Sequence, residues 1–336
     1  MNGGDINITF AKQGIKDYFD KAWYPYLRFV ALGEPTQNFE TLQKLHAYAR
    51  KCSSGRVKFE LQTNGVFNKK IAQWIANNID EVWISFDGLP EVHDELKRME
   101  NNKPTASIIL GNLKILQEKT FAGFRATITS LNVRRQKEIV QFAHQQGIKA
   151  VFTKVVLPPS NPTLHHTFYK VAQSLQVGMM EYANDFVNAW KLSRELDVFY
   201  GNGYINNFDE MCEYACRACL PCPHLTPDGY VSACDRATHG KTPLQEFIYG
   251  KYNSVKGVIV YDKEKIAALQ SRSVYNMPDC SDCSIKYYCA GGCLGTSSQL
   301  AGSMFKITPD YCEAIKYMFE NIDWDPRGGL FPYFMT

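Results

Sequence analysis

The cysteines of this chain are concentrated in its second half. The sequence contains 11 cysteines, and all except Cys52 fall between Cys212 and Cys312. Such a cluster constrains the fold, because the thiols must form disulfides, bind zinc or hold iron–sulfur clusters. Disulfides suit small secreted domains, but the start MNGGDINITF lacks the pattern of a signal peptide and the first half is poor in cysteine. Zinc and iron–sulfur clusters both take four thiolates per site, so both stay open here.

The rest of the composition is that of an ordinary globular protein. The chain has 336 residues, of which 45% are hydrophobic and 21% are charged, which is enough for a sizeable core and about two domains. No apolar run reaches the roughly 18 residues that cross a membrane. The net charge of +3 is too small to indicate nucleic-acid binding. We expect a cytoplasmic protein that binds neither nucleic acid nor a membrane.

The first half alternates apolar strands with amphipathic helices. This alternation predicts an α/β fold with a mostly parallel sheet. The expected strands are 27–32, 57–62, 81–86, 123–129 and 150–156. The expected helices are 9–21, 39–51, 69–77, 105–118, 134–146 and 167–194.

The texture of the sequence changes near residues 195–205. Beyond this point glycine, proline, cysteine and tyrosine dominate, and helical periodicity returns only at 309–321. An irregular region of this kind is expected to bury little core and to need cross-links. We expect two domains, 1–200 and 201–336.

Polar and small residues follow the predicted strands. Ligands bind beyond the carboxyl ends of strands in parallel α/β sheets, so these residues are candidate binding groups. The candidates are Gly33, Glu34, Pro35, Thr63, Asn64, Ser85, Asp87 and Arg125. Arg125 could hold a carboxylate through two hydrogen bonds. The alternative is structural, because Asn-Gly and Asp-Gly pairs after a strand usually form turns.

These motifs resemble the radical SAM superfamily, in its branch with a C-terminal SPASM domain. LGEPTQNFETL resembles the family's GGEP motif, LQTNG its strand ending in T-N-G, ISFDGLPEVHDELKR its S-x-D-G stretch, and FRATIT the strand whose arginine contacts S-adenosylmethionine. The second half resembles the SPASM pattern: Cys219-x9-Gly-x4-Cys234, then C-x2-C-x5-C-x3-C, then a last cysteine 18 residues later. The resemblance implies a partial (β/α) barrel followed by a small iron–sulfur domain.

The resemblance also implies two auxiliary [4Fe–4S] clusters. The second would be held by Cys280, Cys283, Cys289 and Cys312. The first would be held by Cys234, Cys293 and two upstream cysteines, for which Cys219 and Cys216 are expected, with Cys212 and Cys222 as weaker candidates. The strand-end candidates named above would bind S-adenosylmethionine. A peptide or protein would be the substrate, with no catalytic residue assigned.

One feature of the family is missing. No cysteine precedes Cys52, so the C-x3-C-x2-C loop that holds the cluster for cleaving S-adenosylmethionine is absent, and Leu32 stands in place of a glycine. We also count five strands where the family has six, and expect the first to be missing. Without that loop this chain alone is expected to be inactive. A truncated gene, a separate polypeptide or a true loss would explain the difference, so an N-terminal segment or an electron donor is an expected partner.

Three functions fit the sequence. The first is a maturase, or a fragment of one, that in its complete form abstracts a hydrogen atom from a peptide or protein through a 5′-deoxyadenosyl radical. The second is a non-catalytic iron–sulfur protein that binds a peptide or transfers electrons. The third is a structural zinc protein, which would be colourless.

Overall fold

The computed structural model describes residues 4–30, 33–157, 173–204 and 211–322. Its first half is a sheet of six parallel strands in the order β1-β2-β3-β4-β5-β6, with β1 at one edge. The strands are β1 (Tyr26–Phe29), β2 (Lys58–Thr63), β3 (Glu81–Ser85), β4 (Phe121–Ile128), β5 (Ala150–Val155) and β6 (Phe199–Asn202). The α/β fold with a parallel sheet is therefore confirmed.

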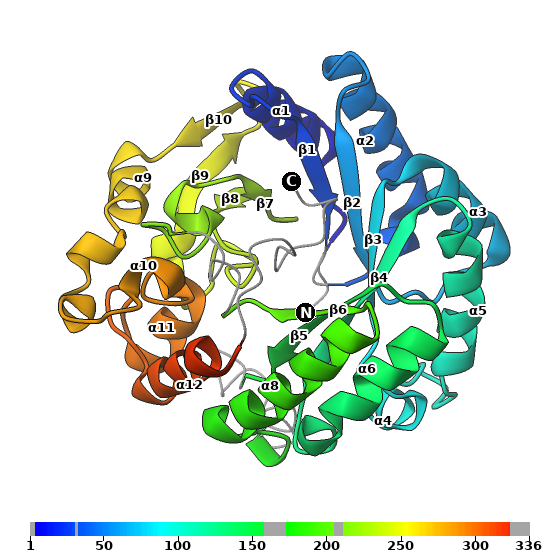
Figure 1. The fold of residues 1–336 in the computed structure, drawn as a ribbon. Helices are drawn as coiled ribbons and strands as arrows, with labels where there is room; N and C mark the ends of the chain where they lie inside the picture. The colour runs from blue at the N-terminus through cyan, green and yellow to red at the C-terminus, as the bar shows by residue number, and fades with distance from the viewer. Residues whose placement is uncertain (1–3, 31–32, 158–172, 205–210, 323–336) are drawn as a thin grey trace.

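Helices connect successive strands and form the outer layer of this sheet (Figure 1). They are α1 (Ile8–Phe19), α2 (Phe39–Cys52), α3 (Lys69–Asn78), α4 (Pro90–Leu96), α5 (Ala106–Gln117), α6 (Gln136–Gln145) and α8 (Met179–Glu195). Local sequence explains their starts: Asn7, Asn38 and Asn68 each accept a backbone N–H at the first turn of the helix that follows. Their apolar faces pack on the strands in one continuous core.

Two predictions in this half were wrong. The sheet has a sixth strand, β6, which is short, and its FYGN sequence has no apolar alternation to mark it. The helix predicted over 167–194 is interrupted, because residues 176–178 are not helical and Gly178 is in an extended conformation before α8. Glycine is the weakest helix former after proline, which explains the break. Residues 167–172 and 31–32 of the predicted elements lie outside the described residues.

The second half contains a four-stranded antiparallel sheet and short helices. The strands, in the order β10-β9-β8-β7, are β7 (His224–Leu225), β8 (Tyr230–Ser232), β9 (Ile248–Asn253) and β10 (Val258–Tyr261). The helices are α9 (Lys263–Gln270), α10 (Lys286–Cys289), α11 (Leu294–Ala301) and α12 (Pro309–Asn321). The helix predicted at 309–321 is confirmed, whereas the antiparallel sheet was not predicted.

This half has a hydrophobic core of its own. Phe247 and Leu269 are fully buried and Leu294 is almost fully buried within it. The expectation that the region buries little core was wrong, because aromatic and aliphatic residues spaced irregularly along the chain converge once β8 and β9 pair.

Two helices join the halves into a ring (Figure 1). Helix α1 lies beside β10, and its Phe10 belongs to the second core. Helix α12 packs on α8, and its Ala314 and Met318 belong to the first core. The two ends of the parallel sheet are thus each bridged to the cysteine-rich half. No helix in the described ranges is both long and apolar enough to cross a membrane.

Candidate functional site

The carboxylate of Glu34 joins the ends of β1 and β2. Its Oε1 accepts the hydroxyl of Thr63 at 2.7 Å, and its Oε2 accepts the backbone N–H of Asn64 at 2.6 Å. Oε1 also accepts both the N–H and the hydroxyl of Thr36. Three of the predicted binding residues therefore form one hydrogen-bonded group, next to Gly33 and Pro35 on the same loop.

Gly65 allows the chain to turn sharply after this group. It has a φ of +76°, in the left-handed region that favours glycine. A Cβ at this position would lie 2.9 Å from Cγ2 of Ile84, which is too close. The T-N-G sequence therefore has a structural reason that is independent of ligand binding.

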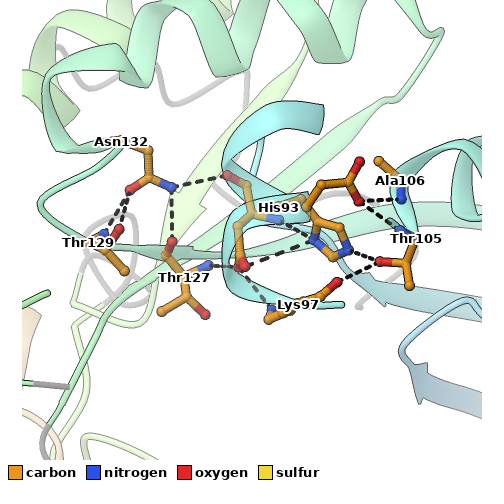
Figure 2. Close-up of polar contacts among 9 residues, drawn as sticks. His93, Lys97, Thr105, Ala106, Thr127, Thr129 and Asn132 are labelled. Carbon is orange, nitrogen blue, oxygen red and sulfur yellow. Dashed lines mark hydrogen bonds and ion pairs between the residues drawn. The ribbon is translucent and has the colours of Figure 1, made fainter. Parts of the chain in front are cut away.

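The carboxylate of Asp87 is enclosed in a network of polar contacts (Figure 2). Asp87 is fully buried, and its Oδ1 accepts from Nζ of Lys97 at 2.9 Å and from the backbone N–H of Thr127 at 3.0 Å. Asn132 donates to the carbonyl of Asp87 and to that of Thr127. The side chain of Asp87 therefore fixes the loop after β3 to the end of β4. Ser85 lies at the end of β3, opposite Arg125.

His93 completes this network in a neutral form. Its Nδ1 accepts the backbone N–H of Asp87 at 3.3 Å, and its Nε2 lies 3.0 Å from the hydroxyl of Thr105. Because that hydroxyl donates to the carbonyl of Lys97, Nε2 must carry the proton and donate to it. Burial lowers the pKa of His93, which favours the same neutral state. Asp94 caps α5 by accepting the N–H groups of Thr105 and Ala106.

Arg125 belongs to a group of charged side chains from both halves of the molecule. Its guanidinium lies 5.6 Å from the ring centre of Phe152. Burial and the charge of Arg28 lower the pKa of Arg125, while Asp235 and Glu60 oppose that shift. Nε of Arg28 in turn lies 2.8 Å from Oε2 of Glu60. We call Arg28, Glu60, Arg125, Lys154, His224 and Asp235 the charged cluster.

Asp235 is the carboxylate that the cysteine-rich half adds to the charged cluster. Burial opposes its ionisation, but Lys154, His224, Arg125 and Arg28 outweigh burial, so its pKa is lowered. It is therefore ionised, and its side chain is reached by solvent. Sequence reasoning missed this residue, although it directly follows the predicted ligand Cys234.

Five of the predicted cysteines line one cavity of about 120 Å³. Four of them are Cys280, Cys283, Cys289 and Cys312, the set expected for the second cluster, and the fifth is Cys293. Burial and the charges of Cys289, Cys283 and Cys312 raise the pKa of Cys280 to about 11. The volume far exceeds the ~15 Å³ that one water molecule needs.

The set expected for the first cluster is also brought together. Cys216 and Cys219 share a hydrogen bond, which is the main reason that the pKa of Cys219 is lowered to about 7. Burial raises the pKa of Cys234, and the charges of Asp235, Cys293 and Cys216 add to this effect. Cys216, Cys219, Cys234 and Cys293 are thus linked through their electrostatic interactions.

The weaker candidates have described contacts with other groups. Cys222 interacts with Arg217 and Arg28. Cys212 donates from its thiol to the carbonyl of Tyr214 at 3.3 Å. Cys216 has described contacts with Cys219, through a side-chain hydrogen bond and through its carbonyl, which accepts the backbone N–H of Cys219 at 3.1 Å.

The donor chemistry fits thiolate-bound clusters. Thiols whose charges raise one another's pKa need a positive group between them to ionise together, and iron, if bound, would supply this. Within the described ranges, no three His, Cys, Asp or Glu side chains lie close enough together to bind a single metal ion.

Comparison with known proteins gives two sequence relatives. No protein-family model matches the chain. The chain is 22% identical over 307 residues to the radical SAM cyclopropyl synthase TigE of Paramaledivibacter caminithermalis, covering 86% of this chain and 58% of that protein. It is 25% identical over 174 residues to a cysteine-type anaerobic sulfatase-maturating enzyme of Clostridium novyi, covering 50% of this chain and 42% of that one. The chain spans about half the length of these curated relatives.

Solved structures share the fold. Native anSMEcpe with bound AdoMet aligns with a TM-score of 0.73 at 19% identity, covering 95% of this chain and 88% of that one. Streptococcus suis SuiB bound to its precursor peptide SuiA aligns with a TM-score of 0.62 at 16% identity, covering 93% of this chain and 70% of that one.

Proposed function

We propose that this chain, a homologue of radical SAM enzymes with the fold of the radical SAM maturases, is part of an enzyme that modifies a peptide or protein substrate by hydrogen-atom abstraction. The proposal includes S-adenosylmethionine and two auxiliary [4Fe–4S] clusters as cofactors. Peptide-bound neighbours support the substrate class, because the anSMEcpe and SuiB folds were both solved with a peptide.

The observation that carries the proposal is that the candidate residues for S-adenosylmethionine and the candidate cysteines for the clusters lie in the same ring. The Glu34, Thr63 and Asn64 group lies at the carboxyl ends of β1 and β2, where such sheets bind ligands, and Arg125 lies within β4 opposite Ser85, the last residue of β3. Cys234 lies in the other half, and the adjacent Asp235 interacts with Arg125. A ligand held at the strand ends would therefore lie near the first set of cysteines.

Each binding residue has a chemical task in this proposal. Arg125 would hold the carboxylate of S-adenosylmethionine, since its guanidinium has no carboxylate within ion-pair distance among the described residues. Glu34 would keep the ends of β1 and β2 in place, and Gly33, Pro35, Ser85 and Thr63 would shape the surface beside it. Asp87 would act indirectly, by fixing the loop after β3.

The charged cluster provides a proton acceptor. Asp235 is ionised and accessible, so one of its carboxylate oxygens could take a proton from a bound substrate. In the complete enzyme, S-adenosylmethionine together with the cluster of a C-x3-C-x2-C loop would supply the radical that takes the hydrogen atom.

The test is anaerobic turnover. The reconstituted protein, as the present chain and as a version extended upstream through a C-x3-C-x2-C loop, is incubated with S-adenosylmethionine and dithionite. We expect 5′-deoxyadenosine from the extended version and none when its three loop cysteines are replaced by alanine. An iron-loaded extended version that forms no 5′-deoxyadenosine would contradict the proposal and favour an iron–sulfur protein that binds peptide or transfers electrons.

A further inference from the structure

Arg272 is a guanidinium buried without a carboxylate partner. The residue has 0% exposure and lies just after α9. Its Nε donates to the carbonyl of Met304 at 2.9 Å, its Nη1 to that of Ala290 at 2.5 Å, and its Nη2 to those of Gly291 at 2.8 Å and Gly292 at 3.4 Å. No ion pair to Arg272 exists among residues 4–30, 33–157, 173–204 and 211–322.

A buried charge of this kind needs an anion to offset its lost hydration. Backbone carbonyls satisfy the N–H donors of Arg272, but they carry no net charge. Burial lowers the pKa of Arg272, and the groups that oppose this are four cysteines, namely Cys219, Cys280, Cys216 and Cys289. Two of them belong to each predicted cluster, so the guanidinium interacts with both sets.

Three of the carbonyls that accept from Arg272 belong to successive residues, which form a left-handed turn. Ala290, Gly291 and Gly292 have φ values of 46°, 74° and 74°, so three successive residues are left-handed. This conformation costs a residue other than glycine ~1 kcal/mol or more, and Ala290 adopts it with its carbonyl on Arg272. A Cβ on Gly291 would lie 3.0 Å from Nη2 of Arg272, so the guanidinium occupies the space beside it.

The position of the turn gives it a function. It joins Cys289 to Cys293, which the cysteine spacing assigns to different clusters. The backbone N–H of Gly291 donates a hydrogen bond to Cys289. The turn thus directs its carbonyls to Arg272 and an amide to Cys289.

We propose that Arg272 is a positioning residue shared by both auxiliary clusters, holding the turn that separates Cys289 from Cys293 and supplying one buried positive charge to both sets of thiolates. This inference rests on the proposed function, because it requires that the cysteines hold iron–sulfur clusters. A fixed cation favours the more negative, reduced form of each cluster, so Arg272 raises both reduction potentials.

The experiment is a redox titration of both auxiliary clusters with dithionite, followed by electron paramagnetic resonance. Arg272→Met removes the charge at similar volume, whereas Arg272→Lys keeps the charge and loses the planar fork. The matched control is Arg194→Met, an exposed arginine on α8 that lies over the ring of Trp190.

We expect Arg272→Met to shift the oxidised-to-reduced equilibrium of both clusters at least tenfold toward the oxidised form, which is 59 mV for a one-electron couple. Arg272→Lys should keep both reduction potentials close to their wild-type values, and Arg194→Met should leave them unchanged. Unchanged potentials in Arg272→Met would overturn the inference.

The two proposals fail differently. A wild-type chain that takes up no iron would overturn the proposed function and this inference with it. Wild-type clusters with normal signals, together with unchanged potentials in the variant, would overturn only the role of Arg272. If Arg272→Met does not fold, Arg272→Gln, whose amide can still donate to a carbonyl of the turn, replaces it with the same two outcomes.

Discussion

Arg125 lies within β4 and Glu34 in the loop after β1, and the two side chains have different surroundings. The carboxylate of Glu34 accepts from four donors of three neighbouring residues, whereas the guanidinium of Arg125 packs on Phe152 and interacts with other charges only at longer range. Of these two residues, Arg125 is therefore the one whose hydrogen-bond donors are available to a ligand.

Replacing Arg125 with methionine should weaken binding of S-adenosylmethionine about ten- to a hundredfold, because a charged hydrogen-bonding partner contributes ~1.5–3 kcal/mol. Binding is measured by equilibrium dialysis on the iron-loaded extended protein. The control Arg194→Met should bind as the wild type does. Equal affinity in Arg125→Met and wild type would remove Arg125 from the site.

The buried imidazole of His93 makes a separate prediction about pH. Burial lowers its pKa in the folded chain below the usual value of about 6.5. Its contribution to stability is therefore complete above the usual pKa and is lost as the pH falls through the folded pKa. The free energy of unfolding should drop between about pH 7 and about pH 5 by more in the wild type than in His93→Gln. Equal losses in both proteins would contradict the assignment of a neutral imidazole to His93.

Elements of regular period could be predicted from the sequence, and irregular ones could not. Helix α2 and strand β3 follow patterns of 3.6 residues and of continuous apolar burial, and both were predicted closely. Strands β6 and β7 have four and two residues, and their formation depends on neighbours that are distant in the chain. Propensity does not reveal such pairing.

The candidate site shows the same division. The resemblance to the SPASM pattern implied Cys280, Cys283, Cys289 and Cys312 as one set, and these four line one cavity together with Cys293. Asp235 and Lys154 were missed, since their meeting depends on how the second half closes over the sheet. The sequence also did not reveal that Asp87 is buried. An Asp-Gly pair after a strand has the same sequence whether its carboxylate binds a ligand or fixes a loop.

The turn after β2 gives a prediction with an internal control. Gly65 and Gly55 both have positive φ, but a Cβ at Gly55 meets nothing within 4 Å, whereas one at Gly65 meets Ile84 and Ile109. Gly65→Ala should lower the free energy of unfolding by ~1–3 kcal/mol more than Gly55→Ala. Urea unfolding measures both. Equal effects of the two substitutions would show that the left-handed backbone alone matters.

At the scale of the whole molecule, each half contributes a helix to the core of the other. Phe10 of α1 packs in the second core, Met318 of α12 packs in the first, and Gly14 of α1 lies against Leu225. A Cβ on Gly14 would lie 2.6 Å from Cδ1 of Leu225, so the two surfaces are in close contact. These contacts pack the two halves firmly against each other.

The halves should therefore unfold together. In urea, tryptophan fluorescence, which reports mainly on Trp74, Trp83 and Trp190 of the first half, and visible absorption of the bound clusters should give coincident transitions. Loss of the absorption at clearly lower urea than the fluorescence change would show that the two halves unfold independently.

The central claim is that the cysteines of the second half hold iron and sulfide. Its most direct test is elemental analysis and electron paramagnetic resonance of the present chain after anaerobic reconstitution. Two clusters with four cysteines each predict about eight iron atoms and about eight sulfides per chain, with a signal after reduction. Colourless protein that binds zinc and no iron would contradict the account.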